Sequence, residues 1–211
     1  MTANHRDIIL IGYSGHALVV HEILVAQGYH PVAYMAPDAM ENKYLNLPYW
    51  GSERDPDSIS KLPGNEYFVA IGDNDIRERV SHYVYDQIHL PPVQAIAKSA
   101  YISPASQIKP GCLVGTGAII HPGCYIGQGT IINTGSSIDH ECTLLNYVHI
   151  GPGAVLCGNV SVGDGSFIGA GSTVIPGIKI GRRAIIGAGS VVLHDVPDGA
   201  KIAGNPARLI A

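Results

Sequence analysis

Aliphatic residues recur at every sixth position from Ile102 to Val192, sixteen times in succession without a slip. This spacing fits neither the 3.6-residue period of a helix nor the two-residue period of an ordinary strand. A six-residue repeat is typical of a parallel β-helix, in which each hexad forms one short strand and one turn. Three hexads close one triangular coil of eighteen residues, with the aliphatic side chains inside. The pattern therefore predicts a parallel β-helix of a little more than five coils.

Two further regularities accompany the aliphatic residue. The residue after it is often glycine, as at Gly115 and Gly127, and we expect glycine there because the turn needs backbone angles that a Cβ atom disfavours. The residue two positions before it is usually small, and we expect this position to fill the remaining interior space. Three of the four cysteines occupy it, which favours core packing over disulfides or metal binding: Cys112, Cys124 and Cys142.

The pattern is different in the amino-terminal third of the chain. Ile8–Ile11 is an apolar run, as expected of a strand buried on both faces. Gly12–His16 follows as a tight turn, and apolar residues then recur at helical spacing from Ala17 to Leu24. Ser14 is the expected N-cap of this helix and Gly28 its expected stop.

The same alternation of strand and helix continues along this third. Pro31–Met35 and Tyr67–Ile71 are predicted strands, and a helix is predicted around Ile76–Gln87. Residues 34–50 are interpreted as irregular and residues 52–57 as a solvated loop. Strands that alternate with helices predict a parallel sheet, here a Rossmann-like βαβ domain. We place the domain boundary at residue 97, with 1–97 as this domain and 98–211 as the β-helix and its C-terminal cap.

Charge and hydropathy narrow the possible partners. The formal net charge is −4 and no cluster of Lys or Arg is present, which disfavours nucleic acid and anionic membranes as partners. No apolar run approaches the length of a membrane span, and the amino terminus lacks the apolar core of a signal peptide. We expect a cytoplasmic protein without a membrane span.

The most informative polar cluster in the hexads is Asp139-His140-Glu141. Histidine suits proton transfer near neutral pH, and a neighbouring carboxylate favours its protonated form and fixes its tautomer. Adjacent strand residues point in opposite directions, so Glu141 reaches His140 only if the pair lies near a corner of the coil. A solvated polar corner without chemistry explains the cluster equally well.

Counting by eighteen places further residues around this cluster. Gly158 stacks above His140, where its N–H is able to stabilise an oxyanion. His149 lies half a coil away, so it meets His140 only if two β-helices lie side by side and share a cleft. Ala170 and Ala188 stack on the side near His149, where small residues leave room for a long, thin ligand. They are equally well explained as small corner residues.

The turn Gly12-x-x-Gly15 opens a helix and therefore offers backbone N–H groups and a positive dipole end to a phosphate. It lacks the full dinucleotide fingerprint, so NAD is not expected. A tight connection that needs glycine only for its geometry is an equally good interpretation.

These motifs resemble a known family. The hexads, Asn133–Gly135 before Asp139–Glu141, and the closing Ala203–Ala207 are similar to the left-handed β-helix acetyltransferases. The amino-terminal motifs narrow the resemblance: Gly12–His16, Ala70–Asn74 and Arg77. Together they resemble the nucleotide-sugar acetyltransferases of the sialic acid and bacillosamine pathways, across nearly the whole chain.

The resemblance implies a homotrimer that binds acetyl-CoA between adjacent β-helices and the nucleotide sugar on the amino-terminal domain. It implies that His140 is the general base and that Glu141 tunes it. It implies that His149, Ala170 and Ala188 contact acetyl-CoA. We add Gly158, which stacks above His140, to this set. The residues assigned to the nucleotide sugar are Ser14, Gly15, His16, Gly51 and Asn133. Relatives commonly place an Asp pair after the second strand, and Ala36-Pro37 stands there instead, with Asp38 as a possible substitute.

The resulting hypothesis is acetyl-CoA-dependent N-acetylation of the 4-amino group of a UDP-linked 4-amino-4,6-dideoxy sugar, without a metal. Two alternatives keep the fold: O-acetylation of sialic acid and N-acetylation of a GDP-linked amino sugar. A zinc hydrolyase of the β-helix class is more distant, because the nine residues between His140 and His149 suit a shared metal poorly. A purely structural β-helix would not require the additional amino-terminal domain.

Overall fold

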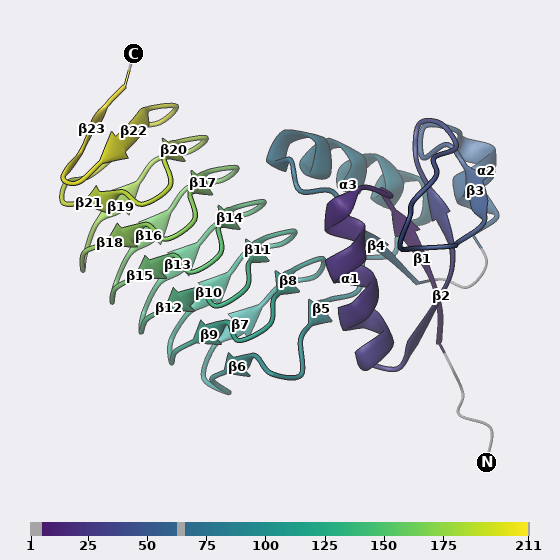
Figure 1. Cartoon of the computed structure of the whole chain (residues 1–211), viewed down its shortest axis with the longest axis horizontal. Coiled ribbons are helices and arrows are strands. Elements are labelled where there is room, and N and C mark those ends of the chain that lie inside the picture. The colour runs from purple at the N-terminus through teal and green to yellow at the C-terminus, as the bar shows by residue number, and fades with distance from the viewer. Residues whose placement is uncertain (1–5, 63–65, 211) are drawn as a thin grey trace. The chain divides into compact units, whose positions relative to one another are not determined.

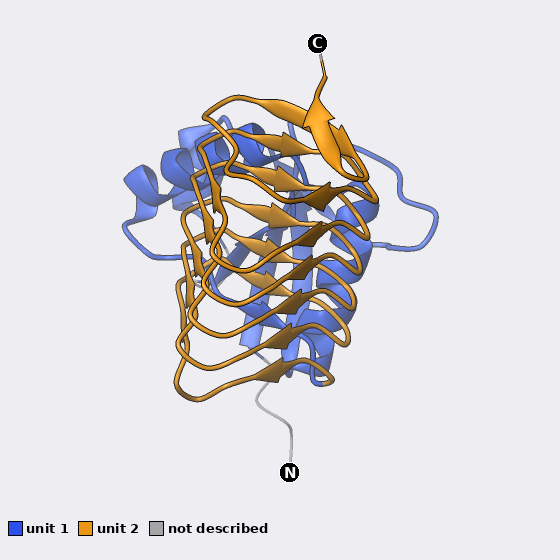
Figure 2. Cartoon of the chain, turned by 90° about the vertical axis from the view of Figure 1, so that its left-hand side faces the viewer, with its two compact units in different colours: residues 1–98 blue, residues 99–211 orange. Residues whose placement is uncertain are grey.

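The structure is a computed structural model that describes residues 6–62 and 66–210. The chain divides into two compact units, residues 1–98 and residues 99–211 (Figure 2). Within the described residues, no helix has both the length and the apolar character needed to cross a membrane.

The first unit is built on a parallel sheet in the order β3-β2-β1-β4 (Figure 1). Its strands are β1 (Arg6–Ile11), β2 (Tyr29–Met35), β3 (Tyr49–Gly51) and β4 (Tyr67–Val69), and β5 (Ala95–Ile96) follows at the end of the unit. The helices are α1 (Gly15–Ala26), α2 (Pro56–Ser60) and α3 (Asn74–Ile88). Ile8–Ile11 are fully buried, which confirms a central strand covered on both faces.

The segment between β2 and α3 differs from its prediction. It contains β3 and α2, which the sequence pattern did not indicate. Asp55 caps α2, because its carboxylate accepts hydrogen bonds from the N–H groups of Asp57 and Ser58, each at 3.2 Å. The prediction that residues 52–57 form a solvated loop was wrong in part, since Glu53 is only 5% exposed. Ser14 does lie at the N-cap of α1, but its side chain makes no capping hydrogen bond.

The second unit is the predicted β-helix, and each aliphatic residue of the hexads is the second residue of a two-residue strand. From Val114 onward all of these aliphatic residues are buried. Strands eighteen residues apart pair in parallel, as Ile126 does with Leu144. The strands are β6 (Tyr101–Ile102), β7 (Gln107–Ile108), β8 (Leu113–Val114), β9 (Ile119–Ile120), β10 (Tyr125–Ile126), β11 (Ile131–Ile132), β12 (Ser137–Ile138), β13 (Thr143–Leu144), β14 (His149–Ile150), β15 (Val155–Leu156), β16 (Ser161–Val162), β17 (Phe167–Ile168), β18 (Thr173–Val174), β19 (Lys179–Ile180), β20 (Ile185–Ile186) and β21 (Val191–Val192).

Three parallel sheets form the faces of this β-helix (Figure 1). One face is β6-β9-β12-β15-β18-β21, the second is β7-β10-β13-β16-β19, and the third contains β8-β11-β14-β17-β20. The third face continues into β22 (Lys201–Gly204) and the antiparallel β23 (Ala207–Leu209), which together end the stack.

The glycine that often follows the aliphatic residue has a different physical reason from the predicted one. The left-handed backbone angles occur two residues later in the turn, at Gly135 and Asn159 for example. Where glycine stands directly after the aliphatic residue, the next coil lies too close for a side chain at positions such as Gly127. A Cβ atom on Gly127 would lie 2.5 Å from the carbonyl carbon of Leu145. The close approach of backbones, rather than a positive φ, therefore explains this glycine.

We expect Gly127→Ala to lower the free energy of unfolding by about 1–3 kcal/mol, the usual cost of forcing atoms into a packed interior. The matched control is Gly135→Asn, where φ is +64° and nothing lies within 4 Å of a built Cβ atom. Asparagine already adopts this conformation at Asn159, so the control should change stability by less than about 1 kcal/mol. Chemical denaturation of both variants measures the difference, and equal losses would contradict the close-approach explanation.

Candidate active site

His140 and Glu141 lie in the turn between β12 and β13, at a corner of the β-helix. Glu141 occupies the left-handed position of that turn, with φ +61°. In this conformation its Oε2 lies 3.0 Å from His140 Nδ1. Both side chains are exposed, by 57% and 71%. The corner therefore satisfies the condition under which these adjacent residues interact, and the contact with Glu141 orients an imidazole that solvent reaches.

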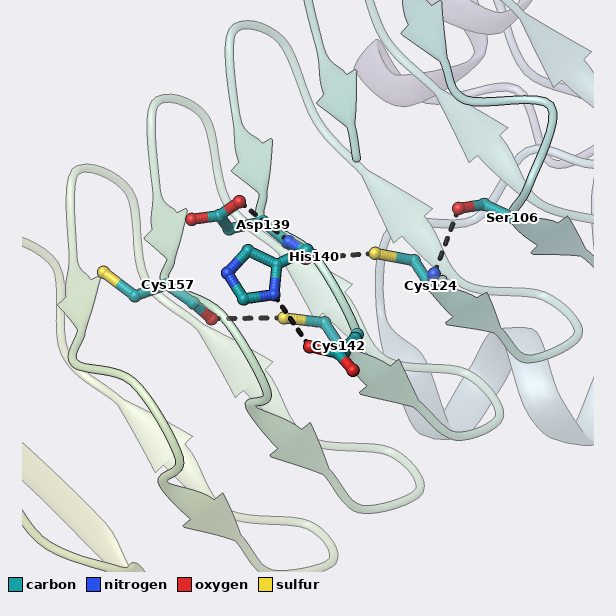
Figure 3. Close-up of polar contacts among 7 residues, drawn as sticks. Ser106, Cys124, Asp139, His140, Cys142 and Cys157 are labelled. Atoms are coloured by element: carbon teal, nitrogen blue, oxygen red, sulfur yellow. Dashed lines mark hydrogen bonds and ion pairs between the residues drawn. The ribbon is translucent and has the colours of Figure 1, made fainter. Parts of the chain in front are cut away.

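Hydrogen bonds on both sides of His140 hold its backbone in place (Figure 3). Asp139 Oδ1 accepts a hydrogen bond from the His140 N–H at 2.8 Å. The inward-facing Cys124 donates from Sγ to the Asp139 carbonyl at 3.0 Å, and Cys142 donates to the Cys157 carbonyl at 3.2 Å. Both thiols are buried in the core, so they support the corner from inside.

The imidazole of His140 lies directly on the backbone of Gly158, one coil further on. A Cβ atom built on Gly158 would lie 2.5 Å from Cε1 and 2.6 Å from Nε2 of His140. Only glycine leaves room for the ring in this position. The side chain that the site orients therefore depends on a residue eighteen positions away in the sequence.

His149 lies on β14, in a different sheet from the strands that flank His140. Its Nε2 is 3.3 Å from Asn133 Nδ2. Its ring meets the ring of Phe167 edge-on, with centroids 5.1 Å apart. Within one β-helix, His149 therefore lies on one face, and His140 lies at the corner between the other two faces.

Ala170 and Ala188 lie in consecutive turns that follow β17 and β20. The N–H of Gly189 donates to the Ala170 carbonyl at 2.8 Å, which joins the two turns directly. Both alanines are exposed. The two small residues thus form a continuous exposed edge next to the sheet that carries His149.

The Gly12–His16 turn connects β1 to α1. Gly12 has φ +103°, and a Cβ atom there would lie 2.8 Å from the Ala70 carbonyl oxygen. Its N–H donates to the Met35 carbonyl, also at 2.8 Å. Gly12 is therefore required by the geometry of the connection. Gly15 begins α1 and is exposed, with nothing within 4 Å of a built Cβ atom.

His16 is held as a neutral imidazole. Burial, together with the positive charge of Arg77, lowers its pKa from 6.5 to about 4. Its Nε2 is buried and has no hydrogen-bond partner in the described part of the chain. Arg77 itself is buried and donates to the carbonyls of Ile71 and Gly72 at 3.1 and 2.9 Å.

Because of His16, the free energy of unfolding should decrease as the pH is lowered. A histidine whose pKa is lower in the folded state contributes full stability above its unfolded pKa of 6.5, and this contribution is lost as pH falls toward 4. We expect a loss of about 2 kcal/mol between about pH 7 and pH 5. His16→Gln should flatten this dependence in urea denaturation. His21→Gln, which removes a less buried imidazole with the same direction of shift, should flatten it less; equal slopes in the two variants would refute the assignment.

A pocket of about 550 Å³ opens in the first unit at the carboxyl ends of its strands. Of the residues that the sequence assigned to the nucleotide sugar, Ser14 lines this pocket. Gly51 instead packs against α2, since a Cβ atom there would lie 2.5 Å from Ser58 Oγ. Glu53, which also lines the pocket, was not predicted from the sequence. It lies in a polar, mostly exposed segment, and no hydrophobic period or motif there indicates a buried residue.

Among residues 6–62 and 66–210, no group of three or more His, Cys, Asp or Glu side chains is arranged to hold a metal ion. Of the two histidines considered for a shared metal, His149 lies on one face and His140 at the corner between the other two faces.

Two families match the chain. Residues 7–84 match the PglD N-terminal domain, and residues 159–194 match the bacterial transferase hexapeptide family of six repeats. The two matches fall in the two structural units.

Several solved structures are similar over almost the whole chain. PerB, the perosamine N-acetyltransferase of Caulobacter crescentus, was solved with CoA and GDP-perosamine; it shares 38% identity over 97% of both chains, with a TM-score of 0.91. Variants of that enzyme with a histidine replaced by Asn or Ala were solved with the same two ligands. The acetyltransferase domain of PglB from Neisseria gonorrhoeae, solved with acetyl coenzyme A, shares 30% identity over 98% of this chain and 100% of that one, with a TM-score of 0.90.

A third structure, WeeI from Acinetobacter baumannii, has a TM-score of 0.83 at 24% identity and covers 96% of this chain and 99% of its own, which supports the fold. The identity with PerB over nearly the full length of both chains is sufficient to assign the family. The chain belongs to the hexapeptide-repeat nucleotide-sugar acetyltransferases, and it is an acetyltransferase with a PglD N-terminal domain.

Proposed function

We propose that this protein transfers the acetyl group of acetyl-CoA to the 4-amino group of a nucleotide-linked 4-amino-4,6-dideoxy sugar. The observation that carries the proposal is the His140–Glu141 pair at a corner of the β-helix. Glu141 Oε2 lies 3.0 Å from His140 Nδ1, and this contact orients the exposed imidazole. The similar structures with CoA and GDP-perosamine support the two substrate classes. UDP, which we expected from the sequence, and GDP are the two candidate nucleotides.

In the proposed mechanism, the sugar amine attacks the thioester carbonyl carbon while His140 Nε2 accepts a proton from the amine. Glu141 accepts the Nδ1–H hydrogen bond and stabilises the resulting imidazolium. The Gly158 N–H stabilises the oxyanion, the C–S bond breaks, and the proton passes to the CoA thiolate. His149, Ala170 and Ala188 contact acetyl-CoA in this proposal. Ser14, Gly15, His16, Gly51 and Asn133 contact the nucleotide sugar.

The proposal includes a homotrimer, with acetyl-CoA bound between adjacent β-helices. Support comes from one face of the β-helix, where Tyr101, Ile119 and Val155 expose 55%, 37% and 37% of their surface on strands of a single sheet. Apolar side chains gathered on one face are typical of an interface between subunits. Sedimentation of the active enzyme tests this part, and a fully active monomer would refute it.

The experiment that tests the function is turnover with acetyl-CoA and a panel of acceptors: 4-amino-4,6-dideoxy sugars on UDP and on GDP, and free sialic acid. We expect acetylation of an amino sugar, with one CoA thiol released per amide formed. Acetylation of sialic acid alone would instead identify an O-acetyltransferase, and the absence of turnover with every amino sugar would contradict the proposal.

A further inference from the structure

The pocket in the first unit has the form of a nucleobase site. Its volume is about 550 Å³, within the usual range for small-molecule sites. The turn after β1 and the end of β2 form one side, and α3 forms another. Apolar and aromatic side chains supply contact surface for a ring: Ile71, Ile76, Val80 and Tyr83.

One charged group in this pocket has an unsatisfied hydrogen-bonding atom. Glu53 lines the pocket although the residue is only 5% exposed, and its Oε2 is buried with no hydrogen-bond partner among the described residues. Its other oxygen lies 3.9 Å from Arg54 Nε, beyond hydrogen-bond distance. A buried carboxylate oxygen without a donor is costly, and such an atom in a native pocket calls for an explanation. A ligand that supplies donors provides one.

The bases of nucleotides differ in what they offer to a carboxylate. Guanine presents N1–H and an N2 amino hydrogen side by side, which matches the two acceptor oxygens of a carboxylate in a bidentate pair. Uracil presents one N–H between two carbonyl oxygens, and those oxygens would face the carboxylate unfavourably. Hypoxanthine keeps N1–H but lacks the N2 amino group.

We propose that Glu53 selects the nucleotide by accepting hydrogen bonds from N1–H and N2–H of guanine, so that the acceptor sugar is GDP-linked. This inference rests on the proposed function for the identity of the reaction, but the binding of the base does not depend on it. Glu53 is a specificity-determining residue far along the chain from the acetyl-transfer residues. The inference changes the expectation of UDP, which rested on family resemblance.

The test is isothermal titration of the full-length protein with GDP, IDP and UDP. We expect wild type to bind GDP about 10- to 100-fold more tightly than UDP, and more tightly than IDP by about 10-fold, because each lost donor leaves a carboxylate oxygen unpaired. In Glu53→Gln, the dissociation constant for GDP should rise about 10- to 100-fold and approach that for UDP. The constant for UDP should change little.

Asp57→Asn is the matched control, since it removes one negative charge from the same segment at an exposed position. It should preserve the preference for GDP. The comparison of GDP with IDP on wild type needs no variant, so the inference stays testable even if Glu53→Gln does not fold. Wild type that binds UDP as tightly as GDP, or Glu53→Gln that keeps the wild-type ratios, would overturn the inference.

Failure of this inference and failure of the proposed function are distinguishable. If UDP-linked amino sugars are acetylated efficiently and GDP is not preferred, the role of Glu53 is wrong and the reaction stands. If GDP binding depends on Glu53 but no amino sugar is acetylated, the base assignment stands and the proposed reaction is wrong.

Discussion

Replacing His140 with alanine is expected to lower kcat by about 10²–10⁴-fold, the usual contribution of a general base. The imidazole lies at an exposed corner and is oriented by Glu141 at 3.0 Å, so its loss removes the proton acceptor without disturbing the core. The KM for acetyl-CoA and the melting temperature should change little. Steady-state kinetics with an amino sugar acceptor measure the effect.

The described part of the chain offers a matched control in a second exposed histidine–carboxylate pair, in which His30 Nδ1 lies 3.0 Å from Asp7 Oδ1. His30→Ala removes the same chemical group from the amino-terminal end of β2, and activity should remain at the wild-type level. Near wild-type turnover of His140→Ala would remove this residue from the mechanism. An equal loss in both variants would indicate a structural effect instead.

Gly158→Ala is expected to reduce kcat about as strongly as His140→Ala. The added methyl group would occupy the space of the imidazole, 2.5 Å from Cε1, so the ring must leave its position beside Glu141. Because the displaced group is the exposed end of a side chain, the stability cost should be small, below about 1 kcal/mol. This separates Gly158 from Gly127, where the added methyl group meets backbone and stability should fall.

A double-mutant cycle tests whether Gly158 acts through His140. If the methyl group works only by displacing the imidazole, Gly158→Ala combined with His140→Ala should be no slower than His140→Ala alone. A further loss in the double variant would point to a second role, such as oxyanion binding by a backbone that the substitution shifts. Normal activity of Gly158→Ala would show that the ring position in the structure is not the one used in catalysis.

The sequence by itself determined the β-helix and its register. A hexad repeat admits one solution for burial, because a shift of one residue would turn every aliphatic side chain outward. The same counting correctly stacked Gly158 above His140, since position in a coil follows from sequence separation alone. The strand of Ile8–Ile11 and the helix after Gly12 were also predictable, since their apolar spacing is local.

The tertiary structure alone decided the features that depend on contacts between segments distant in the sequence. The role of glycine after the aliphatic residue follows from the backbone of the next coil, which lies 2.4 Å from a built Cβ atom at Gly169 and 2.6 Å from one at Gly163. No local backbone preference reveals those distances. Glu53 lies in a polar segment that the sequence pattern predicts to be solvated, and only the folded structure buries it beside the pocket. Burial depends on the residues that surround a side chain in space rather than on its neighbours in the chain. The unpaired Oε2 of Glu53, on which the proposal of guanine binding rests, therefore became visible only in the tertiary structure.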